Sequence, residues 1–188
     1  MKRVFIAIDI SEEARQRAAA YIDALRREFP GPRVGWECPE KLHITLKFLG
    51  EVQPDQLPKI ESVVADVAVR HISFAMQLAG TGTFSLRGEP RILWLGLAHP
   101  VELSDIAARV EEGCSQLGFE PEKRRFSPHL TIARLRDPAG YRGLAAAHRS
   151  GGFEPVSFTV TELAIYESQL RPGGSIYTKL AAFSMNQS

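Results

Sequence analysis

The stretch HITL at residues 43–46 and the stretch HLTI at residues 129–132 repeat one pattern of histidine, apolar residue, threonine and apolar residue. Alternate side chains of an extended strand share one face of a sheet. In each copy the histidine and threonine should therefore lie on an open face and the apolar residues should face a core. Two such strands present paired imidazoles and hydroxyls, a set that suits acid–base chemistry on a phosphate. The residues on the predicted open face are His43, Thr45, His129 and Thr131, and those on the predicted core face are Ile44, Leu46, Phe48, Leu130 and Ile132.

The surroundings of the two copies are also alike. A single match to so short a pattern says little, because most strand histidines are structural or solvated. Here an arginine followed by a β-branched residue, at positions 3–4 and again at 91–92, begins a strand-and-helix unit before each copy. We therefore predict one bilobal domain over residues 1–188, built from an approximate internal repeat of residues 1–90 and 91–188.

Composition narrows the class of protein. Hydrophobic residues make up 44% of the 188 positions, which is enough for an ordinary core and inconsistent with disorder. No apolar run approaches the length of a membrane span or of a signal-peptide core. We expect a soluble, cytoplasmic protein, and nothing in the sequence calls for more than a monomer. Cys38 and Cys114 have no metal-binding spacing, which indicates buried thiols rather than a disulfide framework or a zinc site.

The charge is nearly balanced, but basic residues gather near the motifs. A net charge of +1 argues against a protein that coats nucleic acid by bulk electrostatics. Lys41 and Lys47 flank the first motif, residues 123–125 precede the second, and Arg134 and Arg136 follow it. This placement predicts local recognition of an anion beside the histidines.

Hydrophobic periodicity and turn signals place the remaining elements. Ser11 has the chemistry of a helix N-cap, and Asp137 with the following proline has that of a second. A loop over residues 81–89 with two glycines is predicted to be mobile, and a turn is predicted at 172–174. Helices are predicted over residues 12–29, 55–69, 103–117 and 138–149, and strands over 4–10, 34–37, 42–49, 72–78, 91–98, 129–135, 153–167 and 176–183.

The motifs and their neighbours resemble the 2H phosphoesterase superfamily. The resemblance rests on HITLKFLG at residues 43–50, PRILWLG at residues 90–96 and FSPHLTIAR at residues 126–134, and it extends over nearly the whole chain. Within the superfamily the sequence is most similar to the RNA 2′,3′-cyclic phosphodiesterases, historically called 2′-5′ RNA ligases.

This resemblance implies a fold, a reaction and roles for the motif residues. The implied fold is α+β, with two pseudo-symmetric lobes, each an antiparallel sheet with helices on its outer face, around a central cleft that carries both motifs. The implied reaction is metal-independent hydrolysis of a 2′,3′-cyclic phosphate at an RNA end to a 2′-phosphate. His43 matches the proton donor, His129 the proton acceptor, Thr45 and Thr131 the ligands of phosphate oxygens, and Arg134 a basic residue of the site.

The position of Arg134 conflicts with strict alternation. Alternation places its side chain on the face of Leu130 and Ile132, away from His129. Arg134 would reach the cleft only if the strand twisted or ended near Ala133.

The residue types in the two motifs support the same reaction independently of the family resemblance. In-line attack places the nucleophile and the leaving oxygen on opposite sides of phosphorus. One neutral imidazole can take a proton from water while one imidazolium protonates the departing 3′-oxygen, and threonine hydroxyls can donate to the other oxygens. No carboxylate cluster accompanies the motifs to hold Mg²⁺, so we expect neither a metal nor another cofactor.

Other functions are compatible with the same residues. The enzyme could act on another cyclic or 2′-5′-linked phosphate, or it could join 2′,3′-cyclic and 5′-hydroxyl RNA ends by reversing the reaction. The chain could also be a non-catalytic module that binds RNA ends, or a structural duplication without a site. Two histidines favour catalysis, because arginine or lysine would serve binding equally well.

Overall fold

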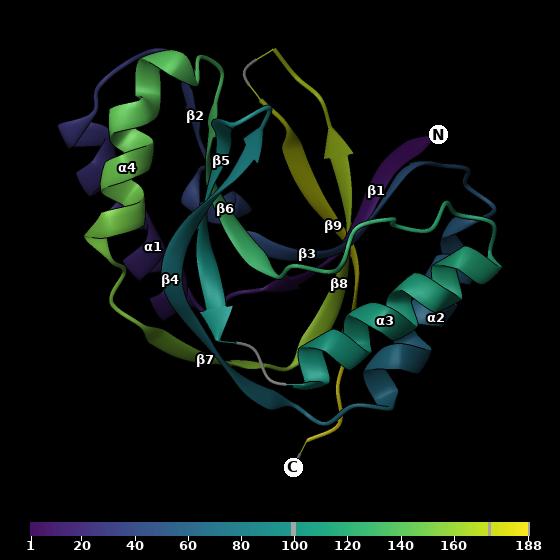
Figure 1. Cartoon of the computed structure of the whole chain (residues 1–188). Helices are drawn as coiled ribbons and strands as arrows, with labels where there is room; N and C mark the ends of the chain where they lie inside the picture. The colour runs from purple at the N-terminus through teal and green to yellow at the C-terminus, as the bar shows by residue number, and fades with distance from the viewer. Residues whose placement is uncertain (99–100, 173, 188) are drawn as a thin grey trace.

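The computed structural model describes residues 1–98, 101–172 and 174–187 (Figure 1). In these described residues strands predominate, and four α-helices and two short 3₁₀ helices connect them. In chain order the elements are β1 (Lys2–Asp9), α1 (Glu12–Glu28), β2 (Val34–Trp36), η1 (Pro39–Lys41), β3 (His43–Val52), α2 (Leu57–Val69), β4 (Phe74–Leu86), β5 (Glu89–Ala98), α3 (Val101–Gln116), β6 (His129–Leu135), η2 (Ala139–Tyr141), α4 (Arg142–Gly151), β7 (Val156–Val160), β8 (Glu162–Gln169) and β9 (Ile176–Ser184).

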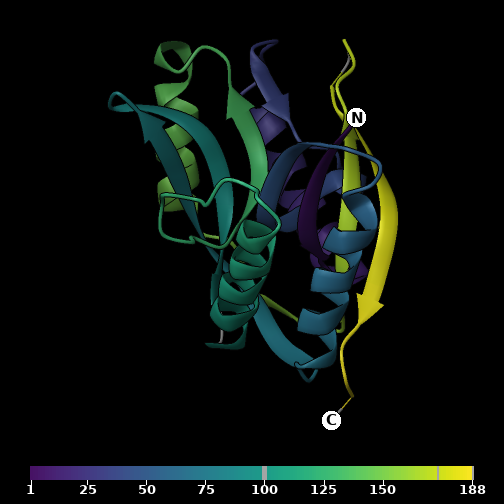
Figure 2. The same ribbon diagram turned by 90° about the vertical axis from the view of Figure 1, so that its right-hand side faces the viewer.

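The strands form one curled antiparallel sheet in the order β7-β4-β5-β6-β3-β1-β8-β9, with β2 beside β6. Its two central strands, β3 and β6, carry the two motifs and are paired at a single position, Ile44 with Leu130. The sheet therefore has two halves that separate on either side of this pair, as Figure 2 shows from the side. The predicted α+β class with antiparallel strands is confirmed, but the two predicted sheets are the two halves of one sheet that is continuous through the pair of β3 and β6.

The two halves of the sheet do not correspond to the two halves of the chain. The half with β1 and β3 is completed by β8 and β9 from the C-terminal end, and the half with β5 and β6 is completed by β4. Each half of the sheet is likewise covered by helices from both halves of the chain. Helix α1 packs against β7 and α4 against β4 and β5, whereas α2 packs against β8 and β9 and α3 against β3 (Figure 1). The repeat of residues 1–90 and 91–188 remains a prediction.

Local chemistry explains where the first helix begins and ends. The Ser11 hydroxyl accepts a hydrogen bond from the amide of Ala14 at 3.2 Å, as its predicted N-cap role requires. Glu12 and Glu13 lie in the first turn and Arg26 and Arg27 in the last, so both ends complement the helix dipole. The apolar stripe of this helix is buried against the sheet.

The prediction of a mobile loop over residues 81–89 is wrong. Strand β4 continues to Leu86 and β5 begins at Glu89, so the two form a hairpin with Arg87 and Gly88 in its tight turn. Both turn residues have positive φ, 53° and 81°, which is the conformation that a two-residue hairpin turn requires. The predicted turn at 172–174 includes Gly173, which lies outside the described residues.

Bulges in both motif strands change which residues reach the cleft. Opposite β1, Leu46 and Leu49 of β3 have no register partner, and opposite β5, Ile132 of β6 has none. A bulge shifts the alternation by one residue, so the side chains beyond it change faces. Phe48, predicted to lie in the core, is therefore 49% exposed on the cleft side.

Candidate active site

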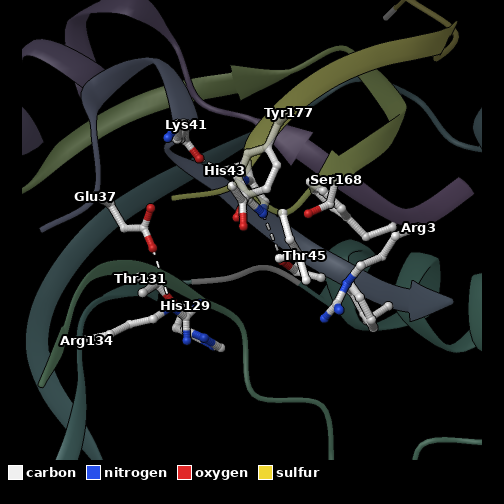
Figure 3. Close-up of a pocket in the computed structure, with 14 residues that line it drawn as sticks. Arg3, Glu37, Lys41, His43, Thr45, His129, Thr131, Arg134, Ser168 and Tyr177 are labelled. Carbon is white, nitrogen blue, oxygen red and sulfur yellow. Dashed lines mark hydrogen bonds and ion pairs between the residues drawn. The ribbon is translucent and has the colours of Figure 1, made fainter. Parts of the chain in front are cut away.

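A cleft of about 360 Å³ lies where the two halves of the sheet meet. Strands β3 and β6 contribute both motifs, and β1, β8, β9 and the segments that lead into β3 and β9 line the remaining sides. Figure 3 shows the two histidines on opposite walls, each on the same wall as its threonine. The residues that line the cleft are Arg3, Phe5, Glu37, Lys41, His43, Thr45, Phe48, His129, Thr131, Arg134, Ser168, Leu170, Ser175 and Tyr177.

The first imidazole is held by hydrogen bonds on both nitrogens. His43 Nδ1 lies 2.7 Å from the carbonyl oxygen of Lys41, so this nitrogen carries a hydrogen and donates it. Its Nε2 lies 3.1 Å from Thr45 Oγ1, on the side of the cleft. The ring stacks on Phe5 with centroids 4.7 Å apart, and Tyr177 packs edge-on against it at 5.4 Å. These contacts fix both the tautomer and the direction of Nε2.

The second imidazole is anchored in the same way. His129 Nδ1 lies 2.7 Å from the carbonyl oxygen of Ser127, which is two residues earlier, as Lys41 is for His43. Phe84 packs edge-on against the ring at 4.7 Å. The Nε2 atom of each histidine is therefore the nitrogen available to a ligand in the cleft, and Thr131 lines the cleft beside the second.

Burial is the main influence on the protonation of both histidines. It lowers the pKa of His43, and Arg134 and His129 lower it further, while the Lys41 carbonyl and the Asp9 carboxylate act in the opposite direction. Burial and Arg134 also lower the pKa of His129, against the carbonyl of Ser127. Both imidazoles are thus biased toward the neutral form until an anion enters the cleft.

Arg134 reaches the cleft because of the bulge in β6. Ile132 and Ala133 are both buried, so the alternation is displaced by one residue and Arg134 joins the face of His129 and Thr131. Its Nε lies 3.4 Å from a carboxylate oxygen of Glu37. The expectation from strict alternation is therefore wrong, and the position implied by the family resemblance is the one the structure has.

Several cleft residues were not identified from the sequence. The guanidinium of Arg3 lies over the ring of Phe48, 4.7 Å from its centroid, at one end of the cleft. Tyr177 comes from the C-terminal strand β9, which sequence order gives no reason to place beside His43. The position of Arg3 in a duplicated arginine-plus-β-branched unit was the one available signal.

Not all basic residues near the motifs belong to the cleft. Lys47 is buried, and its Nζ lies 2.7 and 2.8 Å from the carboxylate oxygens of Glu111 on α3 and 3.1 Å from the Glu120 carbonyl. Its predicted part in anion recognition is therefore wrong. Arg124 and Arg125 line a separate hollow of about 530 Å³ beside α3, and Arg124 pairs there with Glu122.

The described structure also bears on the expectations about metals, thiols and membrane spans. Across residues 1–98, 101–172 and 174–187, no three His, Cys, Asp or Glu side chains come together as a metal-ligand set. Cys114 is buried as predicted, whereas Cys38 is exposed, so the predicted burial of Cys38 is wrong. In the same described part of the chain, no helix combines the length and apolar character needed to cross a bilayer. The predicted metal-independence remains a prediction.

Comparison with known proteins identifies the family. Residues 13–171 match the family model described as the 2′-5′ RNA ligase superfamily. The chain belongs to this superfamily. The family resemblance predicted from the paired motifs is thereby confirmed.

Two relatives of this 2′-5′ RNA ligase superfamily member align over more than nine-tenths of their own length. A protein of Methanothermobacter thermautotrophicus named RNA 2′,3′-cyclic phosphodiesterase is 33% identical over 97% of this chain and 98% of its own. One of the same name from Thermotoga maritima is 32% identical over 95% and 92%.

Solved structures agree with the fold. The crystal structure of TT0787 from Thermus thermophilus aligns with a TM-score of 0.79, 28% identity and 99% coverage of both chains. That of E. coli LigT complexed with 3′-AMP has a TM-score of 0.77, 28% identity and the same coverage. Further structures of LigT hold phosphate or ATP.

Proposed function

We propose that this protein hydrolyses the 2′,3′-cyclic phosphate at RNA 3′ ends to a 2′-phosphomonoester. The observation that carries the proposal is the placement of two imidazoles on opposite walls of one cleft, each with Nδ1 bonded to a carbonyl oxygen, so that Nε2 is the nitrogen on the cleft side. The names of the full-length relatives support this substrate class. RNA 3′ ends and small nucleotides with a cyclic phosphate are the proposed substrates, and a monomer suffices for the reaction.

In the proposed mechanism one histidine accepts a proton and the other donates one. Neutral His129 takes a proton from water through Nε2, and the oxygen of that water attacks phosphorus. The bond between phosphorus and the 3′-oxygen breaks, and Nε2–H of His43 protonates the leaving oxygen. Because attack and departure lie on opposite sides of phosphorus, the acid and the base belong on opposite walls. Each is worth roughly 10²–10⁴ in rate.

The remaining polar residues stabilise the phosphate. Thr45 and Thr131 donate to its non-bridging oxygens, and Arg134 offers a fork of charged donors to the same oxygens. The anionic phosphate also raises the pKa of both imidazoles, which allows His43 to be protonated in the complex. The proposal uses no metal ion, since imidazoles and hydroxyls perform every step.

Ligation is a second candidate reaction. A 5′-hydroxyl in the place of water would give its proton to His129 and attack phosphorus, and departure of the 3′-oxygen, protonated by His43, would leave a 2′-5′ linkage. The 2′-5′ RNA ligase name of the superfamily motivates the test. Ligation depends on the two RNA ends meeting in the cleft, whereas hydrolysis requires only one.

Product analysis tests the proposal directly. A short RNA with a 2′,3′-cyclic phosphate end is incubated with the protein in EDTA, and the product is resolved from 2′- and 3′-phosphate standards. We expect the 2′-phosphate. A 3′-phosphate, no turnover, or turnover that requires an added divalent metal would contradict the proposal. Ligation is measured separately, as the joined product formed when a 5′-hydroxyl RNA is added to the same reaction.

A further inference from the structure

The two cleft walls match in register but differ at the residue that faces each motif histidine. In the ladder between β1 and β3 the partner of His43 is Asp9, whereas in the equivalent ladder between β5 and β6 the partner of His129 is Gly96. Side chains paired across an antiparallel ladder lie on the same face. A carboxylate thus accompanies His43, and the corresponding position beside His129 has no side chain.

The backbone enforces this difference. A Cβ atom on Gly96 would lie 2.7 Å from the carbonyl oxygen of Ala79 and 3.3 Å from the ring of Trp94. Contacts as short as the first are repulsive and involve backbone that cannot rotate away. An aspartate at position 96 would therefore require the backbone at Ala79 to move, so the sheet itself favours the asymmetry between the two histidines.

The next strand outward repeats the asymmetry. Tyr166 of β8 pairs with Phe5, and Phe84 of β4 pairs with the equivalent residue Ile92. The Tyr166 hydroxyl donates to both carboxylate oxygens of Asp9, at 2.7 and 2.9 Å. Burial and the Asp9 carboxylate raise the pKa of Tyr166, so this hydroxyl remains a neutral donor. Phenylalanine at the equivalent position offers no such hydrogen bond on the His129 side.

The charge around Asp9 is partly balanced. Lys179 Nζ lies 2.7 Å from Asp9 and 2.9 Å from Glu162, so these three residues together carry one net negative charge. The other charged groups that act on His43 are Arg134 and His129 across the cleft.

The two imidazoles therefore differ in their electrostatic surroundings. Asp9 raises the pKa of His43, whereas burial, Arg134 and His129 lower it. The influences on His129 are burial, the Ser127 carbonyl and Arg134, and none of these is a carboxylate.

We propose that Asp9 is a positioning residue that keeps the proton on His43 rather than on His129. This inference rests on the proposed function for its catalytic meaning, because it assigns the acid to His43 and the base to His129. The assignment follows from the register and from the space at position 96. In the reaction, the negative charge of Asp9 favours the imidazolium that protonates the leaving 3′-oxygen.

The experiment measures the titration of each imidazole by NMR, together with the pH profile of kcat/KM. In Asp9→Asn we expect the pKa of His43 to fall by roughly half to one pH unit, as for one charge at a partly solvated distance. The His129 titration should move by less than about a third of that shift. The alkaline limb of kcat/KM should move to lower pH with His43. Glu162→Gln is the matched control, because it removes a carboxylate from the same lysine on a strand one place farther from His43 than that of Asp9.

A second variant predicts the opposite sign. Lys179→Met removes the cation that offsets Asp9, so the pKa of His43 and the alkaline limb should rise. Lys179 is partly exposed, so this test survives if Asp9→Asn does not fold. Equal shifts of both histidines, no shift in either variant, or movement of the acidic limb alone would overturn the inference. The NMR titration needs no turnover, so it fails or succeeds independently of the proposed activity.

Discussion

Phe48 and Arg134 occupy equivalent positions on the two cleft walls. Each is the fifth residue after the histidine of its own strand, and each lines the cleft because a bulge precedes it. One wall therefore presents an aromatic face at the place where the other presents a guanidinium. The paired motifs are alike in their acid–base residues and different in the residues that can contact the remainder of a substrate.

Substitution of Arg134 by methionine should weaken the handling of phosphate. The change keeps the aliphatic stem and removes the charged donors, so we expect kcat/KM to fall by roughly 10- to 100-fold, the worth of a charge-assisted hydrogen bond. Steady-state kinetics on a short cyclic-phosphate RNA measures this loss. Arg136→Met is the matched control, since Arg136 lies outside the cleft. Equal losses in the two variants would show that bulk charge, rather than the position of Arg134, assists binding.

Much of the fold could be predicted from local pattern. The strand over residues 129–135 is observed with its predicted bounds, and Ser11 caps the first helix as its side-chain chemistry indicates. The paired motifs identified the family, and the cleft contains His43 and His129 as the alternation around them predicts. These features depend on residues close together in the chain.

The remaining features depend on partners that are distant in sequence. A bulge is a property of a strand and its neighbour, so Phe48 was predicted to lie in the core on the pattern of β3 alone. The two successive apolar residues Ile132 and Ala133 were a visible break in alternation, and they could have indicated the bulge before Arg134. The exchange of β4 and β8 between the halves has no local signal, so Tyr177 and the Asp9–Tyr166 pair could not be placed.

Replacement of either motif histidine by alanine should nearly abolish turnover. Each imidazole is the sole acid or base on its wall in the proposed mechanism, so we expect kcat to fall by at least about 10²-fold in His43→Ala and in His129→Ala. Single-turnover kinetics gives the loss, and thermal melting checks the fold. His71→Ala is the control, because His71 bonds to Asp105 away from the cleft. If a variant kept more than about a tenth of the wild-type rate, the replaced histidine would not be the catalytic acid or base.

Loss of the partner of Lys47 should affect stability and not activity. In Glu111→Ala the buried ammonium of Lys47 loses its carboxylate, and we expect the free energy of unfolding to fall by about 3 kcal/mol. Urea unfolding measures this change. Glu112→Ala, the exposed neighbour on the same helix, should cost far less. A lower kcat with unchanged stability in Glu111→Ala would instead indicate that Lys47 takes part in phosphate recognition, as its position in the sequence suggested.

The pH profiles of kcat/KM and kcat should both be bell-shaped but displaced from each other. The first reports the free protein, in which burial lowers the pKa of both histidines, so its optimum should lie below the ordinary histidine pKa of about 6.5. The second reports the complex, in which the phosphate anion favours the protonated imidazoles, so its limbs should lie at higher pH. Rates from about pH 4 to 9 test both statements. The limbs belong to the coupled pair rather than to single residues, and a monotonic rise to alkaline pH would contradict a required acid.

The threonines distinguish stabilisation of the transition state from simple binding. Thr45 and Thr131 each lie two residues after a histidine and line the cleft, so both hydroxyls can reach the same phosphate. If their hydrogen bonds strengthen as phosphorus becomes five-coordinate, Thr45→Val and Thr131→Val should lower kcat, by up to about 10²–10³ per donor. If the bonds are equal in the ground state and the transition state, KM rises and kcat holds.

We expect kcat to fall in both valine variants, because the hydroxyls flank the line between the two imidazoles along which the oxygens move. Valine keeps the β-branch that suits a strand and removes only the donor. The variants are not equivalent, since Thr45 Oγ1 lies 3.1 Å from His43 Nε2. Thr45→Val should therefore also shift the alkaline limb of the pH profile, while Thr131→Val should leave it in place. Unchanged kcat and KM in both variants would exclude the threonines from the site, and a limb shift in Thr131→Val alone would place the acid on the His129 wall.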